Sequence, residues 1–458
     1  MPAPILGRTR GGTVSALADR TYRNLFTAQV VALLGTGLAT VALGLLAHEL
    51  AGAGAGVVLG GVLAVKMVAN VVVAPVAAAV VTRLPRRALL VSLDLVRAAV
   101  ALCLPWVGAV WQVVVLVVAL QVASAAFTPA FQATIPLVLT DERDYTRALS
   151  LSRLAYDLEG VLSPVLAAAL LAVVSFSGLF AGTAVGFCAS AALVAAVRLP
   201  AGAVDRTTRF AERTLFGIRA YVRTPRLRAQ LGLNLAASAA GAVVIVNTVV
   251  IVRDDLGLGN PAVAVALGAF GAGSMAAALL LPRFLDRLPE RTVMTGAAVG
   301  VVAVLAAGAC LFAAVGARWG LLLGLWPLLG AAHSAVLTPV GRLIRASARA
   351  EGLPALFAAQ YALSHAEWLV TYLLAGVLGA TLGTPATLAC LAAVAAAGLA
   401  HGTATWPAAD PRPLDHHHDD LPADHPHLTG AVRTGTGWRH RHEYVIDTAH
   451  RRRPTTTH

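Results

Sequence analysis

The sequence predicts an all-α membrane protein with twelve transmembrane helices, arranged as two parallel six-helix repeats. Hydrophobic residues make up 58% of the 458-residue chain and charged residues only 13%. The mean hydropathy of +0.75 is too high for an ordinary soluble domain. The apolar residues also fall into runs of about 20 or more, which is the length that a helix needs to cross a bilayer. Finally, short motifs recur in the two parts of the chain, which indicates an internal repeat.

The apolar segments fall into two groups of six, separated by a polar stretch. They lie at roughly 24–49, 55–81, 88–108, 110–138, 148–174, 177–197, 228–252, 261–285, 292–316, 319–341, 353–380 and 384–402. Lipid offers the backbone no hydrogen-bond partners, so each segment should be a helix. The predicted domains are a cytoplasmic segment 1–23, a first bundle 24–197, an amphipathic linker 198–227, a second bundle 228–402 and a His/Asp-rich tail 403–458.

Arginines are concentrated in alternate loops. They cluster before the first segment, after each even-numbered segment and in the middle stretch, whereas the other loops contain little beyond Arg253 and Arg318. The positive-inside rule therefore places both termini in the cytoplasm of a cell whose inner membrane holds the protein. The net charge of +12 follows from this topology, and we expect the bilayer and not nucleic acid as the partner. The first apolar run is long enough to remain as a span, so no cleavable signal peptide is expected. The predicted oligomeric state is a monomer.

Two motifs support the parallel repeat. Thr82-Arg-Leu-Pro-Arg-Arg87 follows the second segment, and Asp286-Arg-Leu-Pro-Glu-Arg291 follows the eighth. Thr128-Pro129, late in the fourth segment, matches Thr338-Pro339, late in the tenth. Such spacing is expected of two bundles related by an axis along the membrane normal. Pro129, Pro164 and Pro339 should break or bend their helices, because proline lacks the backbone N–H.

With these motifs, residues 20 to 402 resemble the major facilitator superfamily. The loop motif of that family, Gly-x-x-x-Asp-Arg-x-x-x-Arg, corresponds to Ala78–Arg87 here, with Thr82 at the acidic position. The resemblance implies that the two loops gate a conformational change, through Arg83, Arg86, Arg87, Asp286, Arg287 and Arg291. The stretch Arg86-Arg-Ala-Leu-Leu-Val-Ser-Leu-Asp-Leu-Val-Arg97 is similar to the macrolide- and siderophore-efflux branch, which implies export. Ser163-Pro-Val-Leu-Ala-Ala168 keeps the proline of the exporter motif in the fifth span but not its glycines.

Several polar side chains fall inside predicted spans, where an unpaired charge costs about 3 kcal/mol or more. Asp94 with Arg97 and Arg153 with Asp157 are spaced as pairs on one helix face, and we expect structural ion pairs. Glu159, His365 and Glu367 have no oppositely charged residue nearby in sequence, which favours a role in lining a cavity or carrying protons. The candidates for substrate binding or proton coupling are Lys66, Asp94, Arg97, Asp157, Glu159, His333, His365 and Glu367; Lys66 shares a helix face with Asn70.

No motif indicates an enzyme. The four cysteines stand singly inside apolar runs, and the His48-Glu49 pair lacks the second histidine of a zinc helix because Gly52 occupies that position. No Walker motif or catalytic Ser/His/Asp set occurs, so transport would draw on an ion gradient. We expect no resident cofactor, except that the tail could bind a divalent metal ion.

The tail is rich in His and Asp, and two interpretations compete. It could be a disordered, charged extension, or it could bind a divalent metal ion, since imidazoles suit nickel, zinc, copper and cobalt. His-rich tails of this kind resemble those of some nickel-resistance permeases. The candidate ligands are His416, His417, His418, His425, His427, His440 and His442.

Three functions are compatible with the sequence. The first is a secondary active, proton-coupled efflux pump for a small amphipathic molecule such as a drug or siderophore. The alternative is an exporter of divalent nickel, cobalt or zinc, with the tail as collector and His333, His365 and Glu367 as transit ligands. The third is a membrane sensor or scaffold that does not transport.

Overall fold

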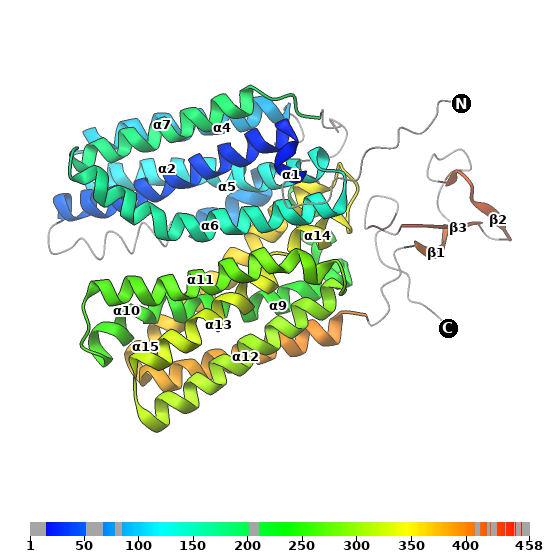
Figure 1. Ribbon diagram of the computed structural model, residues 1–458. Helices are drawn as coiled ribbons and strands as arrows, with labels where there is room; N and C mark the ends of the chain where they lie inside the picture. Colours follow the sequence, from blue (N-terminus) through cyan, green and yellow to red (C-terminus); the bar gives the residue numbers. More distant parts are fainter. Residues whose placement is uncertain are drawn as a thin grey trace.

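The helices form two bundles that lie side by side, with a small β-sheet beyond one end (Figure 1). The computed structural model describes residues 15–51, 67–77, 85–200, 210–407, 413–418, 422, 428–435, 437–443, 445 and 450. The first bundle contains α1 to α7, and the second contains α9 to α15.

The first bundle is built from long apolar helices. They are α1 (Ser15–Ala18), α2 (Arg20–Ala51), α4 (Arg86–Cys103), α5 (Val110–Val138), α6 (Glu142–Leu171) and α7 (Phe176–Ala195), together with a short apolar helix, Met67–Ala77. A 3₁₀ turn, Leu104–Trp106, extends α4. The α6 helix begins where Asp141 accepts hydrogen bonds from the backbone N–H groups of Arg143 (2.9 Å) and Asp144 (3.0 Å). Such a cap satisfies N–H groups that have no partner within the helix.

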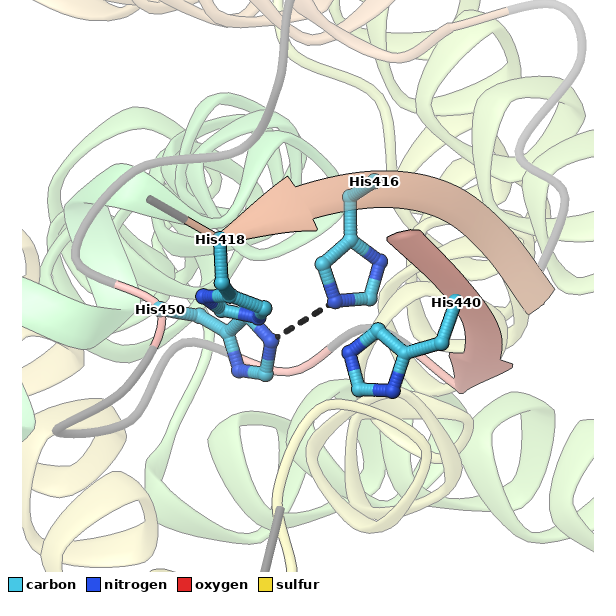
Figure 2. Close-up of side chains that lie close together, drawn as sticks. All are labelled: His416, His418, His440 and His450. Atoms are coloured by element: carbon cyan, nitrogen blue, oxygen red, sulfur yellow. Dashed lines mark hydrogen bonds between the residues drawn. The ribbon is translucent and has the colours of Figure 1, made fainter. Parts of the chain in front are cut away.

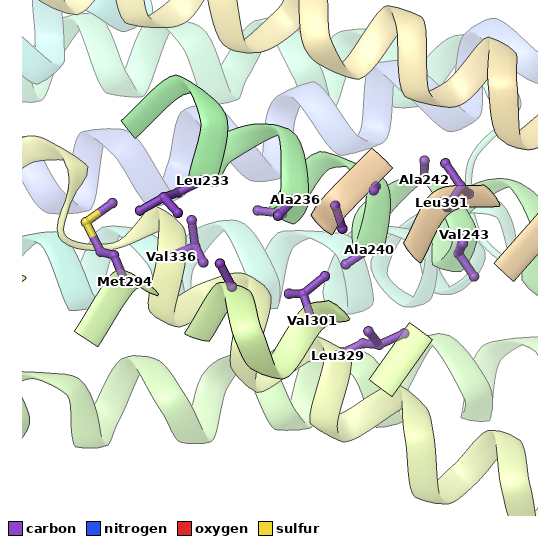
Figure 3. Close-up of a cluster of buried hydrophobic side chains, with 14 of the residues drawn as sticks. Leu233, Ala236, Ala240, Ala242, Val243, Met294, Val301, Leu329, Val336 and Leu391 are labelled. Atoms are coloured by element: carbon purple, nitrogen blue, oxygen red, sulfur yellow. The ribbon is translucent and has the colours of Figure 1, made fainter. Parts of the chain in front are cut away.

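The second bundle follows the polar middle stretch, part of which forms α8 (Phe210–Arg223). Its helices are α9 (Pro225–Ala242), α10 (Thr248–Val250), α11 (Asn260–Leu285), α12 (Glu290–Val315), α13 (Trp319–Leu337), α14 (Val340–Arg345) and α15 (Leu353–Thr405). Two π-helical turns, Val243–Asn247 and Ile251–Asp255, flank α10. The core of this bundle surrounds α9, whose Leu233, Ala236 and Ala240 pack with side chains from α12, α13 and α15 (Figure 3).

Nine helices among the described residues are long and apolar enough to cross a membrane. The last of them, α15, has 53 residues and contains a non-helical residue, Gly383, with φ 74°. Because a helix rises about 1.5 Å per residue, α15 is long enough to span the bilayer twice. Two further segments, α6 and Met67–Ala77, also lie within the bundle. The predicted fold is confirmed, and the predicted count of twelve spans is consistent with these helices.

Gly383 allows a test of the break in α15, where the backbone leaves the helical conformation. Replacing Gly383 by alanine is expected to destabilise the protein by about 1 kcal/mol, because a Cβ disfavours a positive φ. The measurement is the midpoint of thermal unfolding in detergent. Gly324→Ala is the matched control, since a Cβ there also meets nothing within 4 Å but Gly324 lies inside α13. Equal midpoints for the two variants would show that the positive φ of Gly383 does not require glycine.

The predicted effect of the prolines is only partly correct. Pro129 lies inside the continuous helix α5, and α6 likewise continues through Pro164, so neither helix is broken there. Helices in a bundle tolerate proline because neighbouring groups and small local adjustments satisfy the freed carbonyl. Pro339 does interrupt its helix, since α13 ends at Leu337 and α14 begins at Val340.

The tail contains a three-stranded antiparallel sheet, so a purely disordered extension is the wrong interpretation for its described residues. The strands are β1 (Pro413–His418), β2 (Val432–Thr434) and β3 (Gly437–Glu443), in the order β1-β3-β2. His416 pairs with His440 across β1 and β3, and Arg433 pairs with Trp438 across β2 and β3. The sheet is the one β element among the described residues.

Candidate functional site

The two bundles contact each other through polar groups at mid-bundle and at one end. We call that end the basic end. It carries the first residues of α4, α6 and α12 and the last residues of α14, where Arg86, Arg143 and Arg342 lie. At mid-bundle the most extensive contact joins α6 of the first bundle to α11 of the second (Figure 1).

The mid-bundle contact is a three-residue network. Arg153 Nη2 lies 2.8 Å from Asp157 Oδ1, four residues later on α6, which confirms the predicted ion pair. The network also includes Ser274 of α11, which donates to Asp157 Oδ2 at 2.6 Å and accepts from Arg153 Nε and Nη2 at 3.2 Å. Ser274 was not among the residues predicted for the site, although a lone serine in an apolar span is itself a signal. The pair therefore links the two bundles and does more than neutralise one helix.

A second network joins the bundles at the basic end, with Arg342 of α14 at its centre. Arg342 contacts Glu142 Oε1 of α6 at 2.8 Å and Glu290 Oε1 of α12 at 2.9 Å, and it donates to Thr146 Oγ1 at 2.8 Å. Arg345 adds a hydrogen bond to the carbonyl of Thr140. These side chains hold the two halves together at this end by ionic contacts, which can form and break.

None of the described residues that were predicted to gate the protein forms a hydrogen bond or an ion pair with Arg342. Asp286 lies 3.8 Å from Arg143, but both side chains are largely exposed. Arg287 is exposed, and Arg291 Nε is buried without a hydrogen-bond partner among the described residues. Arg87 donates to the carbonyl of Ala195, Arg86 begins α4, and Arg83 lies outside the described residues. Glu142, Glu290 and Arg342 were not among the predicted residues, because a topology count treats loop charges as a group.

Within the first bundle, Asp94 and Arg97 form the predicted ion pair on α4. Ser190 of α7 donates to Asp94 Oδ2 at 2.8 Å. The guanidinium of Arg97 lies 4.1 Å from the ring centre of Phe127 and 4.4 Å from that of Phe187, so cation–π contacts also compensate its charge. This pair holds α4, α5 and α7 together.

Glu159 lies on α6 beside α2. A methyl group added to Gly37 would come within 2.8 Å of Glu159 Oε1. Glu159 has no opposite charge nearby in sequence, but its carboxylate is not isolated, because α2 packs against it in the folded protein. Lys66 lies outside the described residues. Asn70 is buried, and its Oδ1 has no hydrogen-bond partner among the described residues.

The second bundle holds a polar cluster bordered by aromatic rings. Asn234 of α9 donates to Glu367 Oε2 of α15 at 2.6 Å. His333 of α13 is buried, and its Nδ1 lies 2.9 Å from the carbonyl of Ala237. Trp368, next to Glu367, lies against His333 with ring centroids 5.9 Å apart. This cluster combines a carboxyl group, an imidazole and an indole in the interior of the bundle.

His365 points to a different neighbour. Its Nδ1 lies 2.7 Å from the carbonyl of Tyr361, and the two rings are 4.1 Å apart. Glu367 and His365 thus have uncharged partners, which a search for opposite charges in the sequence could not find. His333, His365 and Glu367 form no metal-holding group among the described residues, so the structure does not gather the predicted transit ligands.

The tail histidines divide between the two faces of the sheet. His416, His418 and His440 lie together, and His450 joins them (Figure 2). His417 is exposed and contacts Thr434 Oγ1 through Nε2 at 2.5 Å. His425, His427 and the side chain of His442 lie outside the described residues. His450 was not among the predicted ligands, since nothing in the sequence spacing connects it to β1.

A family model described as Major Facilitator Superfamily matches residues 25–306, which is more than half of the chain. The chain belongs to the Major Facilitator Superfamily. This family consists of membrane transporters, so its members are not in general enzymes. A comparison with curated proteins gives no match.

Solved structures of other Major Facilitator Superfamily transporters share the fold. The human organic anion transporter MFSD10 (TETRAN) aligns with a TM-score of 0.71 and 13% identity, over 84% of this chain and 99% of that one. A bacterial homologue of the iron transporter ferroportin, in an outward-facing state, aligns with a TM-score of 0.66 and 15% identity, over 83% of this chain and 97% of that one. The Escherichia coli fucose:proton symporter FucP aligns with a TM-score of 0.64 and 12% identity, over 86% of this chain and 100% of that one. At these identities the likeness extends to the fold alone.

Proposed function

We propose that this protein is a proton-coupled exporter of a small amphipathic molecule, of the size and polarity of a drug or a siderophore. The observation that carries the proposal is the ionic contact between the two bundles, with Arg342 at the basic end and Arg153–Asp157–Ser274 at mid-bundle. Contacts of this kind can open and re-form as the two halves rock about a central site. Alternating access in such repeat transporters needs this property.

The rest of the site supports both parts of the proposal. The first part of α15, which carries Glu367, also carries Tyr361, Trp368 and Tyr372: Tyr361 packs on His365, and Trp368 packs on Tyr372 and His333. Aromatic walls with a few polar groups are typical of sites for amphipathic ligands. Glu367 lies inside a span and has a neutral hydrogen-bond partner, so it can gain and lose a proton without breaking an ion pair. The basic end would face the cytoplasm under the positive-inside rule.

A groove also lies on the second bundle, away from the polar cluster. It has a volume of about 560 Å³ and lies between α12 and α15, lined by Thr292, Thr295, Gly296, Val299, Ala396, Leu399, Ala400 and Thr403. None of the residues of the polar cluster lines it. A helix surface of this kind is suited to contact with lipid.

The test is transport by the purified protein in liposomes. With a pH gradient imposed, ethidium is the first probe, followed by a macrolide, a ferric siderophore and divalent nickel, cobalt and zinc. We expect gradient-driven movement of at least one organic probe and its loss when an ionophore collapses the gradient. Empty liposomes are the control. No gradient-dependent movement of any probe would contradict the proposal and would favour a sensor or scaffold.

Export of a divalent metal ion is the second candidate, and the four clustered imidazoles in the tail favour it. In the same assay, movement of a metal ion without movement of the organic probes would select this candidate.

A further inference from the structure

The sheet in the tail sorts its side chains onto two chemically different faces. Successive residues of a strand point to opposite faces, so His416 and His418 of β1 share one face while Asp415 and His417 share the other. The burial follows this alternation: His416 and His418 are buried, whereas Asp415 and His417 are exposed. On the exposed face Asp415 accepts from Arg439 Nε at 2.9 Å, and this hydrogen bond lowers the pKa of the Asp415 carboxyl. The charges are thus kept away from the imidazoles.

Four imidazoles from three separate parts of the tail meet on the buried face (Figure 2). His440 of β3 lies opposite His416 in the strand register, and His450 comes from the segment after β3. One ring nitrogen from each of His416, His418, His440 and His450 lies within 4.8 Å of those of the other three. The ring centres of His416 and His440 are 4.6 Å apart, and those of His418 and His450 are 5.1 Å apart.

The ring of His416 is oriented as that of a metal-binding histidine would be. His416 Nδ1 lies 3.1 Å from the carbonyl oxygen of Leu414 and donates to it, so the lone pair of His416 is on Nε2, inside the cluster. Metal-binding histidines usually have such a bond from the second ring nitrogen, which fixes tautomer and ring orientation. His416 Nε2 and His450 Nε2 are 3.0 Å apart. Zinc–nitrogen bonds of 2.0–2.1 Å in a tetrahedron place ligand nitrogens about 3.3 Å from each other. The His416–His450 separation of 3.0 Å is near this value, and the wider pairs, up to 4.8 Å, would have to close around the ion.

We propose that His416, His418, His440 and His450 form a binding site for one divalent transition-metal ion, with zinc as the closest geometric match. The donor set consists of four imidazoles, which suit zinc, nickel, cobalt and copper but not magnesium or calcium, whose preferred ligands are oxygen atoms. Four nitrogen donors without an evident open position resemble a structural zinc site and not a catalytic one. This inference holds whichever substrate the helical bundles move.

The size of the tail gives the ion a physical role. The sheet and its flanking residues span about forty residues, a length at which a hydrophobic core alone seldom suffices and metals or disulfides are usually needed. The buried apolar side chains described here are few: Leu414, Leu428 and Val445. Because the ligands come from β1, β3 and the segment beyond β3, an ion would crosslink all three parts. Metal binding would therefore be coupled to the folding of the tail.

The test uses the full-length protein, purified in detergent through a tag that contains no histidine. After chelation and dialysis, the protein is loaded with zinc and its metal content is measured by mass spectrometry. We expect one equivalent in the unmodified chain and in His417→Ala, which removes an exposed imidazole from the opposite face of β1. The double variant His416→Ala/His440→Ala should retain none, and His450→Ala should bind at least about tenfold more weakly.

Cobalt adds a readout that reports geometry. Tetrahedral cobalt absorbs visible light strongly, so the unmodified chain and His417→Ala should become coloured and the double variant should not. Metal should also protect the tail from trypsin cleavage after Arg433, Arg439 and Arg441, which lie in β2 and β3. Equal metal content in the double variant and His417→Ala would overturn the proposal. Failure of the unmodified chain to bind zinc, cobalt, nickel or copper would overturn it as well.

Discussion

Replacing Glu367 by glutamine is expected to abolish proton-driven transport while leaving exchange of substrate across the membrane intact. Glutamine keeps the size of the side chain and can still accept the hydrogen bond that Asn234 donates to Glu367. It cannot bind or release a proton, so the link between the pH gradient and the movement of the two bundles would be lost. The measurement compares accumulation driven by a pH gradient with substrate counterflow at equal pH, both in liposomes and both at several pH values.

Two variants make this result interpretable. Asp254→Asn removes an exposed acid outside the polar cluster and should preserve the pH dependence. Glu159→Gln tests the competing carboxyl of the first bundle. If Glu159→Gln loses coupling and Glu367→Gln retains it, the proton site belongs to α6 and the assignment to α15 is wrong.

Replacing Arg342 by glutamine is expected to open the basic end and to slow the transport cycle by about tenfold or more. Arg342 has ionic contacts with Glu142 and Glu290, and a hydrogen bond between charged groups contributes about 1.5–3 kcal/mol. Because Glu142 is half exposed, solvent screening reduces the free energy of the Arg342–Glu142 contact toward the lower end of this range. Since 1.4 kcal/mol corresponds to a factor of ten, losing the contact with Glu142 alone shifts the equilibrium between closed and open states by that order.

The opening can be measured by chemical labelling. Leu149 packs against α14, since a methyl group on Gly341 would touch it. In a background in which the four native cysteines are serine, Leu149→Cys should react with a maleimide about tenfold faster when Arg342 is glutamine. Arg283→Gln removes an exposed charge from the same end, outside the network, and should not change the rate. The same labelling rate in both variants would show that Arg342 does not hold the end closed.

The sequence predicted the bundle well because lipid imposes a simple rule. A backbone without water must be helical, so hydropathy alone located α5, α11 and α12 to within two residues at each end. The ion pairs Asp94–Arg97 and Arg153–Asp157 were also predictable, because both partners lie on one helix and its geometry is known.

Contacts between helices could not be predicted in this way. Ser274 joins Arg153 from a helix more than one hundred residues away in sequence, and Asn234 approaches Glu367 across a similar separation. Neither residue carries a charge, so a pattern of opposite charges in the sequence does not include them. The sheet in the tail was missed for another reason. Its strands are short and polar, and their pairing depends on the register between His416 and His440, which composition does not reveal.

Because the strand register decides which face each side chain points to, the proposed metal site depends on whether an insertion in β1 has an odd or an even number of residues. His416 and His418 face the same way because one residue separates them. An insertion of one residue at position 417 would turn one of the two imidazoles to the solvent face, whereas an insertion of two would restore the shared face at a longer spacing. Chains related to this one should therefore tolerate length changes in the connection between β1 and β2 far better than a single-residue change inside β1.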